Sequence, residues 1–141
     1  DYDYLETARF IARHDIRNFQ MNPYFPINTL TLMRGAAALD LESRDEMMRY
    51  VDSIFHYMWE APRNLNDPEL ISATLIELGY DAADLLKKAQ SAQAKAHLMA
   101  NSEKAVARGA FGIPTFYVDD EMFYGKDRLA QVEEEIVRRS V

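Results

Sequence analysis

The stretch that decides the fold lies near the end of the chain and reads Gly109-Ala110-Phe111-Gly112-Ile113-Pro114-Thr115-Phe116-Tyr117-Val118-Asp119-Asp120-Glu121-Met122-Phe123-Tyr124-Gly125-Lys126-Asp127-Arg128. A glycine and a proline at positions 112 and 114 indicate a loop, and the β-branched and aromatic residues 115–118 favour a strand. Two aspartates then predict a turn, after which residues 121–124 return as a second strand. A helix is expected to start near Asp127. Loop, hairpin and helix together form one compact unit.

The chain upstream of this unit reads as about six helices. Apolar residues recur at helical spacing between residues 4 and 14. A second helix follows Pro26, with Asn28 or Thr29 as its cap. Ser43 begins a capping box for a helix that runs to about residue 60. Asp67 and Asp81 are caps of two shorter helices, and residues 91–108 predict one or two more.

The spacing also predicts which side chains of two of these helices face the core. For the helix after Pro26 the expected inward residues are Leu30, Met33, Ala37 and Leu41. For the helix after Ser43 they are Met47, Val51, Ile54, Phe55 and Met58.

The composition of the chain excludes several classes of binding site and partner. The chain has 141 residues, of which 48% are hydrophobic, and a net charge of −7. The length and the hydrophobic content suit one packed domain, and the negative charge argues against a nucleic-acid groove or binding to an anionic membrane.

The absence of cysteine excludes disulfides, thiolate metal sites and a cysteine nucleophile within these residues. The three histidines lack ligand spacing, so no metal site is expected. We expect a cytoplasmic protein, because cysteine-free chains fit a reducing compartment and no leader or membrane span is visible.

The hairpin raises the question of what covers it. Residues 115–118 carry apolar bulk on both faces, which is typical of a strand inside a covered sheet. Either the hairpin lies alone on a helical bundle, or partner strands precede Asp1, and the second is favoured. Asp1 is not an initiator methionine, which fits that expectation. On this basis the 141 residues alone are expected to be poorly stable and inactive.

At this point the residues resemble a known family. Gly112-Ile113-Pro114-Thr115, the hairpin, and residues 123–128 look like the C-terminal half of a thioredoxin-fold domain. Together with Phe25-Pro26-x-Asn28-Thr29-Leu30 and Arg34, they are similar to the DsbA-like branch that holds 2-hydroxychromene-2-carboxylate isomerases and kappa-class glutathione transferases. The resemblance spans essentially the whole chain.

The resemblance implies an α/β fold, namely a thioredoxin-like C-terminal half (β-hairpin plus terminal helix) with a large all-helical insertion. Residues 1–15 would be a helix that links the thioredoxin core to the insertion, residues 16–108 the helical insertion, and residues 109–141 the C-terminal part of the thioredoxin-like domain. The family's N-terminal β-α-β unit, which holds the catalytic serine or cysteine, would lie upstream of Asp1. No catalytic nucleophile is therefore expected within the segment.

A glutathione site is implied at two places in the deciding stretch. The first is Ile113-Pro114, where a cis peptide bond would turn the Ile113 backbone toward the cysteinyl residue of glutathione. An ordinary trans proline in a loop is the alternative on residues alone. The second comprises Tyr124, Gly125, Lys126 and Asp127. Its backbone N–H groups would bind the γ-glutamyl carboxylate and Asp127 the α-amine; alternatively, Asp127 is an N-cap.

Asn28, Thr29 and Arg34 are the candidates for binding a second, organic substrate. Arg34 can hold a carboxylate with two hydrogen bonds. The alternatives are a hydrophobic staple at a helix start and an exposed helix arginine.

The function implied is that of a glutathione-dependent isomerase of the 2-hydroxychromene-2-carboxylate isomerase type, with glutathione as cofactor and a small aromatic-derived substrate. Nucleic acid and membrane are not expected as partners, and relatives suggest a homodimer. Three alternatives stay open: a kappa-like transferase, a DsbA-like thiol-disulfide oxidoreductase with its nucleophile upstream, and a helical ligand-binding or partner-binding module without catalysis.

Overall fold

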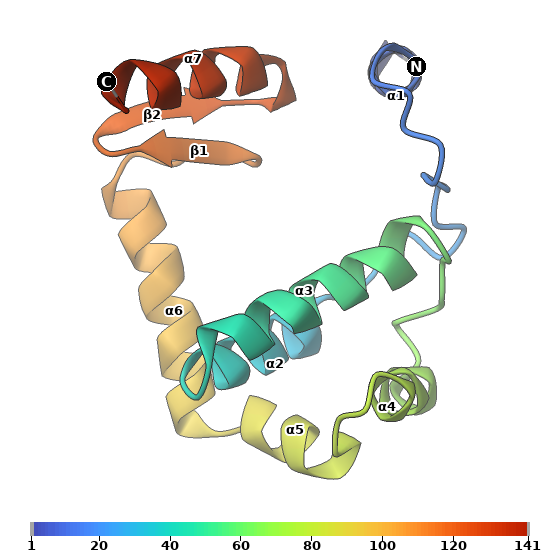
Figure 1. Ribbon diagram of the computed structural model, residues 1–141. Helices are drawn as coiled ribbons and strands as arrows, with labels where there is room; N and C mark the ends of the chain where they lie inside the picture. Colours follow the sequence, from blue (N-terminus) through green and yellow to red (C-terminus); the bar gives the residue numbers. More distant parts are fainter. Residues whose placement is uncertain (1, 141) are drawn as a thin grey trace. The chain divides into compact units, whose positions relative to one another are not determined.

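A computed structural model of the chain describes residues 2–140. The chain divides into two compact units at residues 98 and 99, and each unit is described by itself. The first unit contains α1 (Tyr2–Arg13), α2 (Leu30–Asp40), α3 (Arg44–Trp59), α4 (Pro68–Glu77) and α5 (Ala82–Ala89) (Figure 1). Helix α6 (Ala92–Ala107) runs across the division. The second unit continues with β1 (Thr115–Val118), β2 (Glu121–Tyr124), the 3-10 turn η1 (Lys126–Arg128) and α7 (Leu129–Arg139).

The predicted helix starts are confirmed where a side chain caps the backbone. Ser43, Asp67 and Asp81 each accept a hydrogen bond from a backbone N–H in the first turn of the helix that follows, at 3.3, 2.9 and 3.0 Å. These bonds satisfy donors that the helix itself leaves without partners. At the start of α2 the side chain of Asn28 accepts the N–H of Leu30, whereas Thr29 makes no capping bond.

Helix α2 lies against both α3 and α5, and α4 lies against α5. The core that these helices share comprises Leu32, Leu39, Tyr50, Tyr57, Met58, Leu65, Ile71, Leu75, Ala82 and Leu85. Leu65 belongs to the loop before α4 and is 1% exposed, so this loop is part of the core.

The predicted inward faces of α2 and α3 are partly wrong. Leu30 and Met33 on α2 are exposed, and so is Leu41 just after its end. On α3, Phe55 is exposed. On α3 the prediction is otherwise confirmed, since Met58 is buried and Met47, Val51 and Ile54 pack partly buried against the core. On α2 the phase was wrong, and Ala37 is the one predicted residue that is buried. Small residues on α2 allow close approach of a neighbour, and the apolar side chains beside them become the buried ones.

Gly35 shows how tight this approach is. A Cβ added there would lie 2.8 Å from the hydroxyl oxygen of Tyr50, which is buried and donates a hydrogen bond to the carbonyl of Leu32 at 3.1 Å. Gly35→Ala is therefore expected to lower the free energy of unfolding by about 1–3 kcal/mol through overpacking. Because the clash is with the hydroxyl, the cost should shrink in a Tyr50→Phe background. Urea denaturation of the four chains measures this coupling, and an equal cost of Gly35→Ala in both backgrounds would contradict the packing described.

The second unit is built on an antiparallel hairpin. Thr115 lies opposite Tyr124 and Val118 opposite Glu121, with a two-residue turn between the strands. Helix α7 packs on β1, whose four residues are all half-buried. The hairpin and the terminal helix are thus as predicted, and β1 and β2 are the strands found among residues 2–140. The proposed three-part domain division and the strands expected before Asp1 stay predictions. None of the helices in residues 2–140 combines the length and apolar character needed to cross a membrane.

Candidate functional site

The hairpin register brings the two predicted glutathione-binding segments together. The carbonyl of Pro114 accepts a hydrogen bond from the N–H of Gly125 at 3.0 Å, which extends the ladder beyond the Thr115–Tyr124 pair. The Ile113-Pro114 peptide bond is cis, as the resemblance implied. Residues 113–114 and 124–127 therefore form one continuous surface, which we call the hairpin site.

Aromatic side chains form one wall of the hairpin site. The rings of Phe111 and Tyr124 lie 4.6 Å apart between centroids. Gly112 permits this arrangement, because a Cβ there would come within 2.7 Å of the Tyr124 ring. Ile113 is 91% exposed, so the loop before Pro114 is open to a ligand.

Gly125 connects the hairpin to the helix that follows. Its φ of 99° and ψ of 150° belong to a region that residues with a Cβ seldom adopt. This conformation lets the Gly125 N–H pair with Pro114 while the next residues turn into η1. A glycine is required at this position for backbone reasons alone, since no atom lies within 4 Å of the place of an added Cβ.

Asp127 is an exposed carboxylate in the first turn of η1. It accepts a hydrogen bond from the Lys126 ammonium at 2.9 Å. That hydrogen bond, with the nearby charge of Arg128, holds the pKa of Asp127 below its usual range, so the group is ionised at neutral pH. The alternative reading as an N-cap is wrong, because neither η1 nor α7 has a side-chain capping bond.

The predicted substrate residues lie in the first unit, with Asn28 and Thr29 just before α2 and Arg34 within it. The N–H of Asn28 donates to the side-chain oxygen of Asn66 at 2.9 Å, and the amide nitrogen of Asn66 donates in turn to the carbonyl of Pro26 at 3.3 Å. Asn66 therefore holds the loop that carries Asn28. Arg34 is half-buried, and within residues 2–140 no carboxylate pairs with it.

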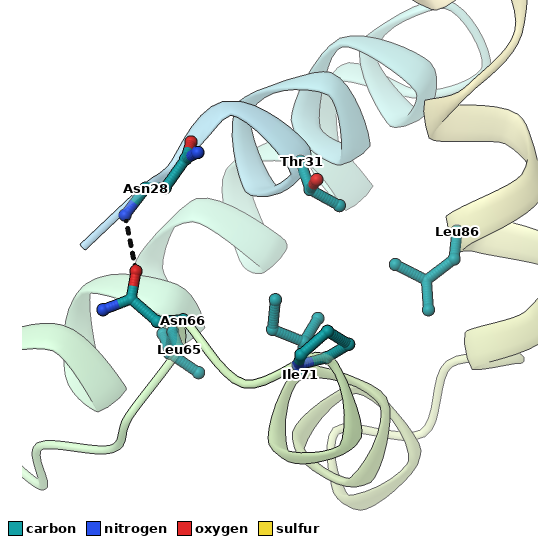
Figure 2. A pocket seen from close by; sticks show the side chains of 7 residues that line it. Asn28, Thr31, Leu65, Asn66, Ile71 and Leu86 are labelled. Atoms are coloured by element: carbon teal, nitrogen blue, oxygen red, sulfur yellow. Dashed lines mark hydrogen bonds between the residues drawn. The ribbon is translucent and has the colours of Figure 1, made fainter.

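Asn28 also lines an open pocket of about 180 Å³ to which α2, α4, α5 and the loop before α4 contribute side chains (Figure 2). Thr31, Leu65, Asn66 and Leu86 contribute to the same pocket. Sequence reasoning missed all four. Asn66 sits just before a recognised helix cap, which was the one local sign that its loop is ordered. The pairing of that loop with residues 26–28 is a contact between distant segments, which periodicity does not reveal.

Comparisons with known proteins show the family to which the chain belongs. A profile of the DSBA-like thioredoxin domain matches residues 9–137, which is nearly the whole chain. The chain belongs to the DsbA-like thioredoxin domain family.

Relatives of this DsbA-like chain include proteins named 2-hydroxychromene-2-carboxylate isomerase. One from Sphingobium xenophagum is 28% identical over 109 residues, covering 77% of this chain and 56% of the relative. One from Pseudomonas putida is 32% identical over 87 residues, covering 60% of this chain and 41% of the relative. The chain thus spans about half the length of these relatives.

A solved structure titled 2-hydroxychromene-2-carboxylate isomerase has the same fold as this DsbA-like chain. Its TM-score is 0.79 at 21% sequence identity, and the match covers 99% of this chain and 67% of that one. The predicted fold class, a thioredoxin-like half with a helical insertion, is confirmed.

Proposed function

We propose that the protein containing this chain is a glutathione-dependent isomerase of the 2-hydroxychromene-2-carboxylate isomerase type. The names of the relatives support the reaction class. The glutathione dependence rests on the hairpin site. The observation that carries it is the hydrogen bond between Gly125 and Pro114, because it places the open loop at Ile113 beside the ionised Asp127.

The residues of the hairpin site fit a γ-glutamyl-cysteinyl ligand. The Ile113 backbone, next to a strand end, can pair with the extended backbone of a cysteinyl residue. The backbone at the start of η1 suits the γ-glutamyl carboxylate, because the first turn of a helix has N–H groups without intrahelical partners. Asp127 supplies the negative charge that the α-ammonium requires.

Glutathione would supply a thiolate that adds reversibly to an unsaturated, aromatic-derived substrate and leaves after a bond has rotated or a ring has opened. These 141 residues contain no cysteine, so none of them can supply the thiol, and in this proposal glutathione supplies it. The group that holds the thiolate is proposed to lie outside these residues. Asn28, Thr29 and Arg34 are proposed to bind the organic substrate, with Arg34 pairing with its carboxylate.

Calorimetric titration of the complete protein that contains this chain with glutathione tests the hairpin site. We expect saturable binding of one glutathione per chain, weakened about three- to tenfold by Asp127→Asn, the range for an exposed charged hydrogen bond. Asp120→Asn in the hairpin turn is the matched control and should bind as the wild type does. If no saturable binding is seen with a folded chain, the glutathione proposal fails.

A further inference from the structure

The lining of the pocket in the first unit changes from exposed residues at the mouth to buried apolar residues deeper in. At its mouth lie the exposed residues Asn28, Asn66 and Pro68, and the hydrogen bond between the two asparagines closes one side (Figure 2). Deeper in, Leu65 and Ile71 are 1% and 8% exposed. An open mouth over a buried apolar floor is the usual form of a small-molecule site.

One polar group interrupts the apolar lining. The side chain of Thr31 projects from α2 toward the space bounded by Ile71 and Leu86 (Figure 2). Within residues 2–140 its hydroxyl makes no hydrogen bond to the protein. A hydroxyl can both donate and accept, so it can pair with a phenolic hydroxyl or with a carbonyl. The side-chain oxygen and nitrogen of Asn66 both form hydrogen bonds to the backbone of residues 24–28, so this side chain is engaged within the protein.

The size of the pocket restricts the ligand. Sites for drug-sized molecules are typically at least about 300 Å³, and an apolar cavity of about 150 Å³ accepts benzene. A pocket of about 180 Å³ therefore suits a single aromatic ring with one small substituent. The flat shape and apolar faces of such a ring match Leu65, Ile71 and Leu86.

We infer that this pocket binds a monocyclic aromatic ring that carries one hydroxyl or carbonyl group, with the ring between α2 and α4 and its polar group on the Thr31 hydroxyl. The inference deepens the proposed function, on which it rests in one respect: Asn28 is among the residues assigned to the aromatic-derived substrate. The pocket would hold the ring of that substrate.

Phenol is the probe that tests this inference. In a titration followed by ¹H–¹⁵N correlation spectra, saturable shifts are expected at residues around the pocket, with a dissociation constant on the order of 1 mM for so small a ligand. Thr31→Val keeps the shape of the side chain and removes the hydroxyl, so it should weaken phenol binding about three- to tenfold. Leu86→Trp should fill the pocket and abolish the binding. Ile76→Trp, at a site 63% exposed on α4 and outside the pocket, is the matched control.

Spectra and melting curves of each variant establish that it is folded before binding is compared. If Leu86→Trp does not fold, Thr31→Val decides the test alone. Shifts that do not saturate, or that scatter over residues outside the pocket, would overturn the inference. So would a Thr31→Val chain that binds phenol as tightly as the wild type. Glutathione binding is measured at residues 113–127 and phenol binding at residues 28–86, so either result can fail without the other.

Discussion

Replacing Asn22 with leucine is expected to lower the free energy of unfolding by about 2–5 kcal/mol, because two or three buried backbone groups lose their partner. Asn22 is 2% exposed. Its amide nitrogen donates to the carbonyls of Met58 and Arg63 at 3.1 and 3.4 Å, and its oxygen accepts the N–H of Tyr24 at 2.9 Å.

These bonds hold the end of α3. The last-turn carbonyls of a helix have no partner within it. Here the Tyr57 carbonyl accepts the N–H of Arg63, the Met58 carbonyl accepts the Asn22 side chain, and the Trp59 carbonyl accepts the N–H of Gln20. Asn22 therefore ties the segment between α1 and α2 to the end of α3, and leucine would fill its volume but leave this end unsatisfied.

Urea denaturation of Asn22→Leu measures the loss. Asn64→Ala is the control, because the Asn64 side chain makes one hydrogen bond, to the N–H of Asn66 at 3.3 Å. It should cost about 0.5–1.5 kcal/mol, the contribution of a single ordinary hydrogen bond. An Asn22→Leu chain that is no less stable than Asn64→Ala would contradict this account of the α3 terminus.

Gly125→Ala is expected to weaken glutathione binding more than about tenfold and to lower stability by about 1–3 kcal/mol. The backbone at Gly125 lies at φ 99°, where a Cβ causes strain even though the space around it is empty. Relief of that strain would rotate the peptide groups that pair with Pro114 and begin η1. Those groups are the ones proposed to meet the γ-glutamyl carboxylate, and a backbone donor that is displaced leaves the charge without its partner.

Gly109→Ala provides the matched control for this prediction. Gly109 lies in the same unit at φ 94°, after the end of α6, and it is outside the hairpin site. Its substitution should cost similar stability but leave glutathione affinity within about twofold of the wild type. Equal losses of affinity in the two variants would mean that unfolding, and not the hairpin site, explains the effect.

The features that the sequence predicted are local ones. The caps at Ser43, Asp67 and Asp81 depend on residues within one turn of each other. The hairpin follows from a β-branched and aromatic run around two aspartates, and its register brings Pro114 and Gly125 together without further information. The cis bond before Pro114 came from the family resemblance, and the second cis bond, at Phe25-Pro26, was not predicted.

The features that the sequence did not predict depend on contacts between distant segments. No pattern in the sequence marked Asn22 or Asn66, yet their side chains bond to backbone groups about 40 positions away. The buried face of α2 was assigned with the wrong phase, because the decisive contact is Gly35 against Tyr50 of another helix. The pocket also depends on contacts between distant segments, since α2, α4 and α5 each contribute a part of its lining.

The central claim is that Asp127 binds the amine of glutathione in the hairpin site. The most direct measurement is a calorimetric cycle of wild type and Asp127→Asn, each titrated with glutathione and with an analogue in which a glutaryl group replaces γ-glutamyl and so lacks the amine. The account predicts that Asp127→Asn weakens glutathione binding about three- to tenfold and leaves the affinity for the analogue unchanged. An equal effect on both ligands, or none on either, would contradict it.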